Sequence, residues 1–180
     1  MKSLQEKYKK EVIPAMKEKF GYGNILAVPH FEKVTVNIGI GKFSGDEKAL
    51  EEIIRDLTMI VGQKPVFTKA KKAIAAFKTR QGMKVGLVAT LRKQKMFDFL
   101  ERLVSLASPR SRDFRGLNQK SVDQNGNLTI GLKEHIIFPE ISHENIHHIF
   151  GLEITVKTTA KTQEEGMELF RMTGFPIKTN

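Results

Sequence analysis

Apolar residues recur along the chain at two spacings, and each spacing predicts one kind of element. Recurrence every three to four residues predicts helices over residues 2–20, 46–62, 94–107 and 162–172. Alternation of apolar and polar residues predicts strands over residues 30–41 and 151–160, and we expect further strands over 65–70, 83–92 and 127–133. Pro14 lies inside the first helix, so we expect a kink or a break there.

The order of these elements indicates the fold class. Strands and helices are mixed along the chain, and the loops are too short for a repeated parallel βαβ unit. We therefore predict an α+β fold, with a mainly antiparallel sheet of about five strands and helices packed on one face. The other face would remain available for a partner. We expect one domain over residues 1–180, with extended loops at 71–82 and 109–149.

The charge balance indicates a polyanionic partner. The chain has 180 residues, with 30 Lys+Arg against 20 Asp+Glu and a net charge of +10. Such an excess attracts nucleic acid first and an anionic membrane surface second. Cysteine is absent, which excludes disulfides and thiolate chemistry. No apolar run is long enough for a signal peptide or a membrane span, so we expect a soluble cytoplasmic protein with no membrane partner.

The densest positive charge lies in the loop at 71–82. No acidic residue occurs between Lys69 and Lys84. The residues that we expect to contact nucleic acid in this loop are Lys71, Lys72, Phe77, Lys78 and Arg80. Cationic side chains pair with phosphates, and an exposed aromatic ring stacks on a base. The alternative is a solvated basic hairpin that only opposes aggregation.

A second basic segment spans residues 109–116. Its arginines are Arg110, Arg112 and Arg115, whose planar guanidinium groups pair with phosphates and stack on bases. The same segment holds Asp113, so an ion-paired turn is the alternative interpretation. These arginines are candidate RNA or intersubunit contacts, and both interpretations stay open.

One short motif has the spelling of a catalytic site. His143, Glu144 and His147 match the HExxH pattern of zinc hydrolases. On one helix, two histidines four residues apart share a metal ion while the glutamate activates water. The segment is short and polar, between Pro139 and Gly151, so a brief surface helix explains it without a metal. We expect no metal, no cofactor and no catalytic residue in this protein.

Five separated motifs resemble one known family, in the same order and over nearly the whole chain. They are VTVNIGIG at 34–41, GQKPVFTKAKKAIAAFKTRQG at 62–82, MFDFLERLVSLASPRSRDFRGL at 96–117, GLKEHIIFPEI at 131–141 and ITVKTTAKTQEEGMELF at 154–170. Together they resemble bacterial large-subunit ribosomal protein five, of the universal family that binds 5S rRNA. The family's fold is an antiparallel sheet backed by helices, similar to RNA-recognition domains. The resemblance therefore implies a structural ribosomal protein and not an enzyme.

The resemblance also implies roles for particular residues. Members of the family bind 5S rRNA and help to fix it in the central protuberance of the large subunit. The residues that match their polar recognition set are Asn37, Gln63 and Thr90. Amide and hydroxyl groups bond ribose hydroxyls and phosphates without adding charge. From the pattern alone, Asn37 is a surface strand residue and Gln63 is a helix-end cap.

Two longer segments imply further partners. In the family, the loop that matches residues 71–82 reaches the T-loop region of peptidyl-site tRNA. The segment that matches residues 109–149 approaches small-subunit ribosomal protein thirteen and forms an intersubunit bridge. Two departures from the family concern backbone shape: Ala76 stands where glycine precedes the aromatic residue, and Lys93 with Gln94 replaces a turn that more usually bears glycine.

A general RNA-binding regulator or chaperone is the alternative with the same class of partner. Such a protein would exist in excess of ribosomes and would bind unrelated RNAs with comparable affinity. A ribosomal protein of this family would prefer 5S rRNA.

Overall fold

The chain is divided into two compact units in the computed structural model. The structure describes residues 3–43, 45–107, 116–141 and 146–178. The first unit contains residues 1–34, 91–130 and 155–180, and the second unit contains residues 35–90 and 131–154. Four strands contribute residues to both units, namely β1 (Phe31–Gly39), β3 (Lys84–Leu91), β4 (Leu128–Leu132) and β5 (Leu152–Thr158). One domain over the whole chain therefore stays a prediction.

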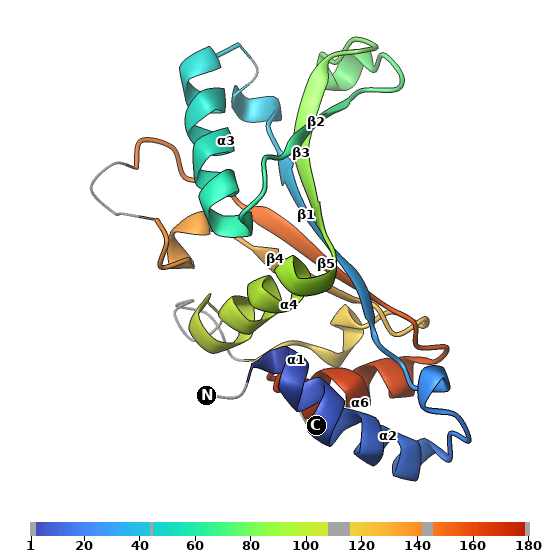
Figure 1. The fold of residues 1–180 in the computed structure, drawn as a ribbon. Coiled ribbons are helices and arrows are strands. Elements are labelled where there is room, and N and C mark those ends of the chain that lie inside the picture. The colour runs from blue at the N-terminus through green and yellow to red at the C-terminus, as the bar shows by residue number, and fades with distance from the viewer. Residues whose placement is uncertain (1–2, 44, 108–115, 142–145, 179–180) are drawn as a thin grey trace. The chain divides into compact units, whose positions relative to one another are not determined.

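Among the described residues, five strands form one sheet in the order β2-β3-β1-β5-β4 (Figure 1). Their bounds are β1 Phe31–Gly39, β2 Val66–Lys69, β3 Lys84–Leu91, β4 Leu128–Leu132 and β5 Leu152–Thr158. The sheet is antiparallel and helices pack on it, which confirms the predicted α+β fold class. Burial alternates along β5, where Leu152, Ile154 and Val156 are buried and Glu153 is exposed. Period-two patterning therefore predicted this strand and its inward face.

The first unit begins with a helix that changes its winding. It consists of α1 (Leu4–Lys7), a π-helical turn (Tyr8–Val12) and α2 (Ile13–Phe20). Pro14 lies in the first turn of α2. The Ile13 N–H donates to the Tyr8 carbonyl five residues back, so the chain widens just before the residue that has no N–H. The predicted irregularity at Pro14 takes this form, and the helix continues through it.

An aromatic cluster surrounds Phe31 in the core of the first unit. The ring centroids of Tyr8, Phe97, Phe170 and Phe175 lie 6.3, 6.2, 5.7 and 6.5 Å from that of Phe31. These rings come from β1, the N-terminal helix, α4 (Lys93–Arg102), α6 (Gln163–Thr173) and the segment after α6. The Tyr8 hydroxyl donates to the Pro29 carbonyl at 3.0 Å, which satisfies its polar atom inside the cluster.

The second unit holds α3 (Glu47–Val61), β2, β3 apart from Leu91, and most of β1. Asp46 begins α3 by accepting a hydrogen bond from the Ala49 N–H at 3.1 Å. Gly62 ends α3 in the left-handed conformation, with φ of +70°. On its inner face α3 buries Ile53, Leu57 and Ile60. The chain then turns directly into the β2–β3 hairpin, so the end of the helix fixes where the hairpin starts.

Candidate nucleic-acid interface

The β2–β3 hairpin presents one face to the core and one face outward. In β3, Leu87 and Ala89 are buried, so Val88 and Thr90 lie on the opposite face. The pairing register sets Thr68 opposite Gly86 and Val66 opposite Val88. We call this outward surface of the second unit the open face. Val66 is 66% exposed there, and Thr68 and Thr90 are half-buried.

The structure places Asn37 on the same open face. Asn37 is exposed in β1 between buried Val36 and Ile38. Its side-chain Oδ1 atom lies 3.8 Å from the position that a Cβ atom on Gly86 would occupy. Gly86 and Thr90 are four residues apart on one strand and therefore share a face. Asn37 and Thr90 thus belong to one surface, although they come from different strands.

Gln63 joins this surface from the loop after α3. Its Nε2 atom donates to the Thr90 carbonyl at 3.4 Å. The helix-end cap is Gly62 and not Gln63, so the interpretation of Gln63 as a cap was wrong. The left-handed glycine reverses the chain, and this turn directs the glutamine side chain toward β3. The three polar residues of the predicted recognition set therefore all lie in the second unit.

Thr68 is a polar residue of the open face that the sequence did not single out. Its hydroxyl oxygen would lie 2.6 Å from a Cβ atom on Gly86, so the side chain leans over that glycine. Among the described residues, neither the Thr68 hydroxyl nor the Asn37 amide makes a side-chain hydrogen bond to protein. Both groups are therefore free to bond a partner. The hairpin register that reveals this placement is not readable from local sequence.

The basic loop, residues 71–82, forms the tip of the hairpin (Figure 1). Its base is closed where the Gly82 N–H donates to the Ala70 carbonyl at 2.9 Å. Ile74 and Thr79 pair further out, and a 3-10 turn (Ala75–Phe77) lies between them. The predicted contact residues are all exposed, namely Lys71, Lys72, Phe77, Lys78 and Arg80. The loop therefore presents four cations and Phe77, which is 76% exposed, on a hydrogen-bonded turn.

The backbone at Ala76 does not require the glycine that the family has at this position. Ala76 lies in the 3-10 turn with an ordinary backbone, and the left-handed residue is Lys78, with φ of +52°. The Lys78 N–H donates to the Ala75 carbonyl, which closes the turn around this residue. The tip thus bends without glycine at position 76.

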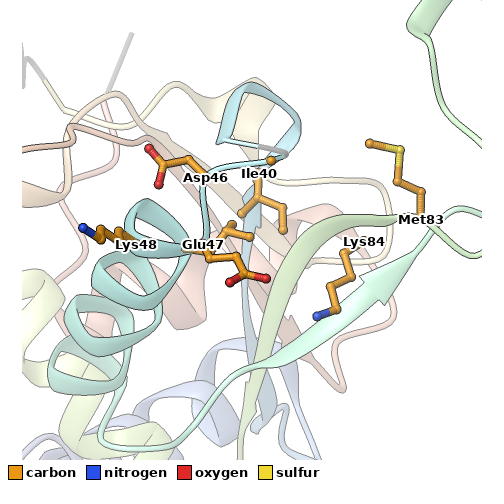
Figure 2. A pocket seen from close by; sticks show the side chains of 8 residues that line it. Ile40, Asp46, Glu47, Lys48, Met83 and Lys84 are labelled. Carbon is orange, nitrogen blue, oxygen red and sulfur yellow. The ribbon is translucent and has the colours of Figure 1, made fainter.

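A groove of about 820 Å³ lies in the second unit between the start of α3 and the start of β3. Figure 2 shows Glu47 from α3 and Lys84 from β3 approaching it from different sides. The lining also includes Asp46 and Lys48, so the groove carries charges of both signs. Lys84 further lies over the Phe67 ring, with Nζ 4.3 Å from its centroid. Mixed charge makes this groove a poorer match to a phosphate backbone than the basic loop.

The zinc motif does not have its required geometry in the described residues. Residues 146–150 are not helical. The His147 N–H donates to Glu52 Oε1 at 3.0 Å. The His148 ring packs edge-on against the Phe43 ring, with the two ring centroids 5.6 Å apart. His143 and Glu144 lie outside the described residues, as do Arg110, Arg112 and Arg115. Over the described ranges, no group of three or more metal-ligating side chains occurs, and no helix is long and apolar enough to cross a membrane.

The fold and the exposed groups define a basic α+β protein that presents a polar sheet face and a cationic hairpin loop. Residues 24–80 match the family described as ribosomal protein L5, and residues 84–177 match the C-terminus of the same family. Large ribosomal subunit protein uL5 of Clostridium beijerinckii is 52% identical over 177 residues, which cover 98% of this chain and 99% of that protein. The uL5 of Desulforapulum autotrophicum is 49% identical over 178 residues, which cover 99% of each chain. Large ribosomal subunit protein uL5c of Porphyra purpurea is 52% identical over 175 residues, with 97% of each chain covered.

The chain therefore belongs to the ribosomal protein L5 family. As a member, it is a structural component of the large ribosomal subunit and not an enzyme. The resemblance seen in the sequence is confirmed, and the zinc-hydrolase interpretation is wrong. The predicted ribosomal and cytoplasmic location agrees with this membership.

Proposed function

We propose that the protein binds 5S rRNA through the open face and helps to attach it in the central protuberance of the large subunit. The observation that carries this proposal is the meeting of Asn37, Gln63 and Thr90 in one unit. They come from a strand, a loop and a second strand, yet Gln63 bonds Thr90 and Asn37 shares its face. Uncharged amide and hydroxyl groups discriminate RNA by bonding ribose hydroxyls and base edges.

The basic loop is assigned a second RNA partner, the T-loop region of peptidyl-site tRNA. Support comes from its exposed cations and from Phe77, whose ring has room for a nucleotide base. We also propose that the segment 109–149 contacts small-subunit ribosomal protein thirteen at an intersubunit bridge. That part of the proposal rests on family resemblance, because residues 108–115 and 142–145 lie outside the described ranges.

A binding titration at physiological salt tests the main proposal. The full chain is titrated with 5S rRNA and with a length-matched unrelated RNA. Tight binding to 5S rRNA alone is expected. Equal binding to both RNAs would mean that only the positive charge has been explained, and would favour a general RNA-binding role.

Two variants then connect the binding to the open face. Asn37→Ala and Thr90→Ala each remove a polar group without changing the charge, and each is expected to weaken 5S rRNA binding about tenfold. Thr129→Ala is the matched control, since Thr129 is an exposed strand threonine of the first unit. Normal 5S rRNA binding by Asn37→Ala and Thr90→Ala would refute the proposed recognition face.

A further inference from the structure

Two glycines lie directly opposite each other on the open face. The Ile40 N–H donates to the Val85 carbonyl at 3.0 Å, and in an antiparallel ladder this bond sets Gly39 opposite Gly86. Gly39 is the exposed last residue of β1. Gly86 is buried and the Thr68 side chain covers it, whereas Gly39 leaves its backbone exposed near Thr68 and Asn37.

The two positions differ in why glycine occupies them. A Cβ atom on Gly86 would lie 2.6 Å from the Thr68 hydroxyl oxygen and 2.9 Å from the Ile38 carbonyl oxygen, so packing requires glycine there. A Cβ atom on Gly39 would meet nothing within 4 Å, and its φ is outside the left-handed region. Neither packing nor backbone conformation of the chain therefore explains Gly39. Glycine weakens a strand, and in a strand it often marks a place where a ligand approaches the backbone closely.

We propose that the bare backbone at Gly39, bordered by Thr68 and Asn37, is a subsite for one ribose of a bound RNA strand. This inference rests on the proposed function of the open face. A ribose is compact and carries a 2′-hydroxyl that both donates and accepts a hydrogen bond. The Thr68 hydroxyl matches it in both roles, and the Asn37 side chain offers a donor and an acceptor beside it.

The positive charge of the hairpin beyond Thr68 favours RNA as the occupant of this subsite. Thr68 is followed by Lys69, and the hairpin continues into the basic loop with its exposed cations. An RNA strand whose ribose lies over Gly39 therefore has cationic side chains nearby for its phosphates. Val66 and Val88 lie opposite each other on the same face, which adds an apolar surface for the sugar or base edge.

Gly39→Ala tests the subsite without disturbing the fold. The added methyl group meets no protein atom, so thermal stability is expected to stay equal or to rise slightly. It occupies the space of the ribose, and 5S rRNA binding is expected to weaken about tenfold. The matched control is Gly131→Ala, because Gly131 is also an exposed strand glycine with an open Cβ position and ordinary φ. This control is expected to bind like the unchanged protein.

Two substitutions of Thr68 test the hydroxyl itself. Thr68→Val keeps the side-chain shape and is expected to weaken 5S rRNA binding about fivefold, whereas Thr68→Ser keeps the hydroxyl and is expected to bind nearly normally. Chemical acylation of RNA 2′-hydroxyls gives an independent measurement. In the complex with the unchanged protein, the nucleotide in the subsite is expected to be protected from acylation. That nucleotide is expected to lose its protection in both the Gly39→Ala and the Thr68→Val complexes.

The outcomes separate this inference from the proposed function. If the unchanged protein prefers 5S rRNA and Gly39→Ala binds it equally well, the subsite is refuted while the proposed function stands. If the unchanged protein binds 5S rRNA and an unrelated RNA equally, the proposed function fails. The subsite is then decided by whether Gly39→Ala weakens binding of either RNA relative to Gly131→Ala.

Discussion

His135 Nε2 lies 3.7 Å from Asp56 Oδ2, with both side chains buried inside the second unit. The Phe150 N–H donates to His135 Nδ1 at 3.4 Å, so in the neutral ring Nε2 carries the proton and faces the carboxylate. The Phe150 ring stacks on the imidazole, with the two ring centroids 3.9 Å apart. Burial lowers the pKa of His135, and the charge of Asp56 only partly opposes this shift.

This lowered pKa predicts that stability falls on mild acidification. In the unfolded chain the imidazole takes up a proton near its ordinary pKa of 6.5, whereas the folded protein resists protonation to a lower pH. Between those two pH values only the unfolded state gains the proton, so the free energy of unfolding decreases as pH drops through 6.5. Urea unfolding followed from pH 7.5 to 5.5 measures this slope.

A histidine variant assigns that slope to one residue. His135→Gln removes the titrating group, so the unfolding free energy is expected to lose much of its pH dependence in this window, whatever its absolute value. His30→Gln changes an exposed histidine of the first unit and serves as the control. Equal slopes in the unchanged protein and His135→Gln would contradict the assignment.

A close approach between two glycines predicts a large effect of a small substitution. In the first unit, a Cβ atom on Gly166 of α6 would lie 2.4 Å from the Cα atom of Gly126. Alanine normally stabilises a helix relative to glycine, but here its methyl group would clash with backbone atoms that cannot move away. Gly166→Ala is expected to destabilise the protein by about 1–3 kcal/mol in urea unfolding.

The same chemical change elsewhere in the first unit is the control for that experiment. A Cβ atom on Gly23 would meet nothing within 4 Å, and its φ is ordinary. Gly23→Ala is therefore expected to leave the midpoint of unfolding nearly unchanged. Similar losses in both variants would mean that glycine flexibility, and not the contact with Gly126, is responsible.

Local patterns predicted the elements, but they could not predict which residues meet. Alternating burial identified the strand around Asn37, and helical spacing identified α3. The pairing of Thr68 with Gly86 depends on the hairpin register, which joins residues far apart in sequence. For the same reason, Gln63 looked like a helix cap until the left-handed turn at Gly62 directed it to Thr90.

The backbone is strained at Lys93, one of the positions where this sequence departs from the family. Lys93 has φ of +54° at the start of α4, a conformation that suits glycine. A side chain in the left-handed region costs about 1–2 kcal/mol. Lys93→Gly is expected to stabilise the protein by about 0.5–1 kcal/mol, since the greater freedom of glycine in the unfolded chain offsets part of the relief.

Thermal unfolding of Lys93→Ala separates strain from charge. Alanine removes the exposed ammonium group but keeps the Cβ atom, so the melting temperature is expected to stay near that of the unchanged protein. If Lys93→Ala stabilises as much as Lys93→Gly, the gain comes from removing positive charge and not from the backbone.

The two RNA surfaces are expected to respond differently to loss of charge. The double variant Lys71→Gln/Lys72→Gln removes two exposed cations from the basic loop. It is expected to bind 5S rRNA within about twofold of the unchanged protein, because the recognition set lies on the open face. Binding to a hairpin RNA that copies the tRNA T-arm is expected to weaken, and its logarithmic salt slope to shrink by about 0.7–0.9 for each phosphate that the variant no longer neutralises.

A second double variant has the same total charge as the first. Lys120→Gln/Lys133→Gln also removes two exposed lysines, and neither lies in the basic loop. If net charge alone governs binding, both double variants weaken the T-arm complex equally, and the assignment of tRNA contact to the basic loop fails. A change in the salt slope of T-arm binding that occurs only in Lys71→Gln/Lys72→Gln would support that assignment. Long-range attraction depends on the total charge, whereas counterion release depends on which phosphates are contacted.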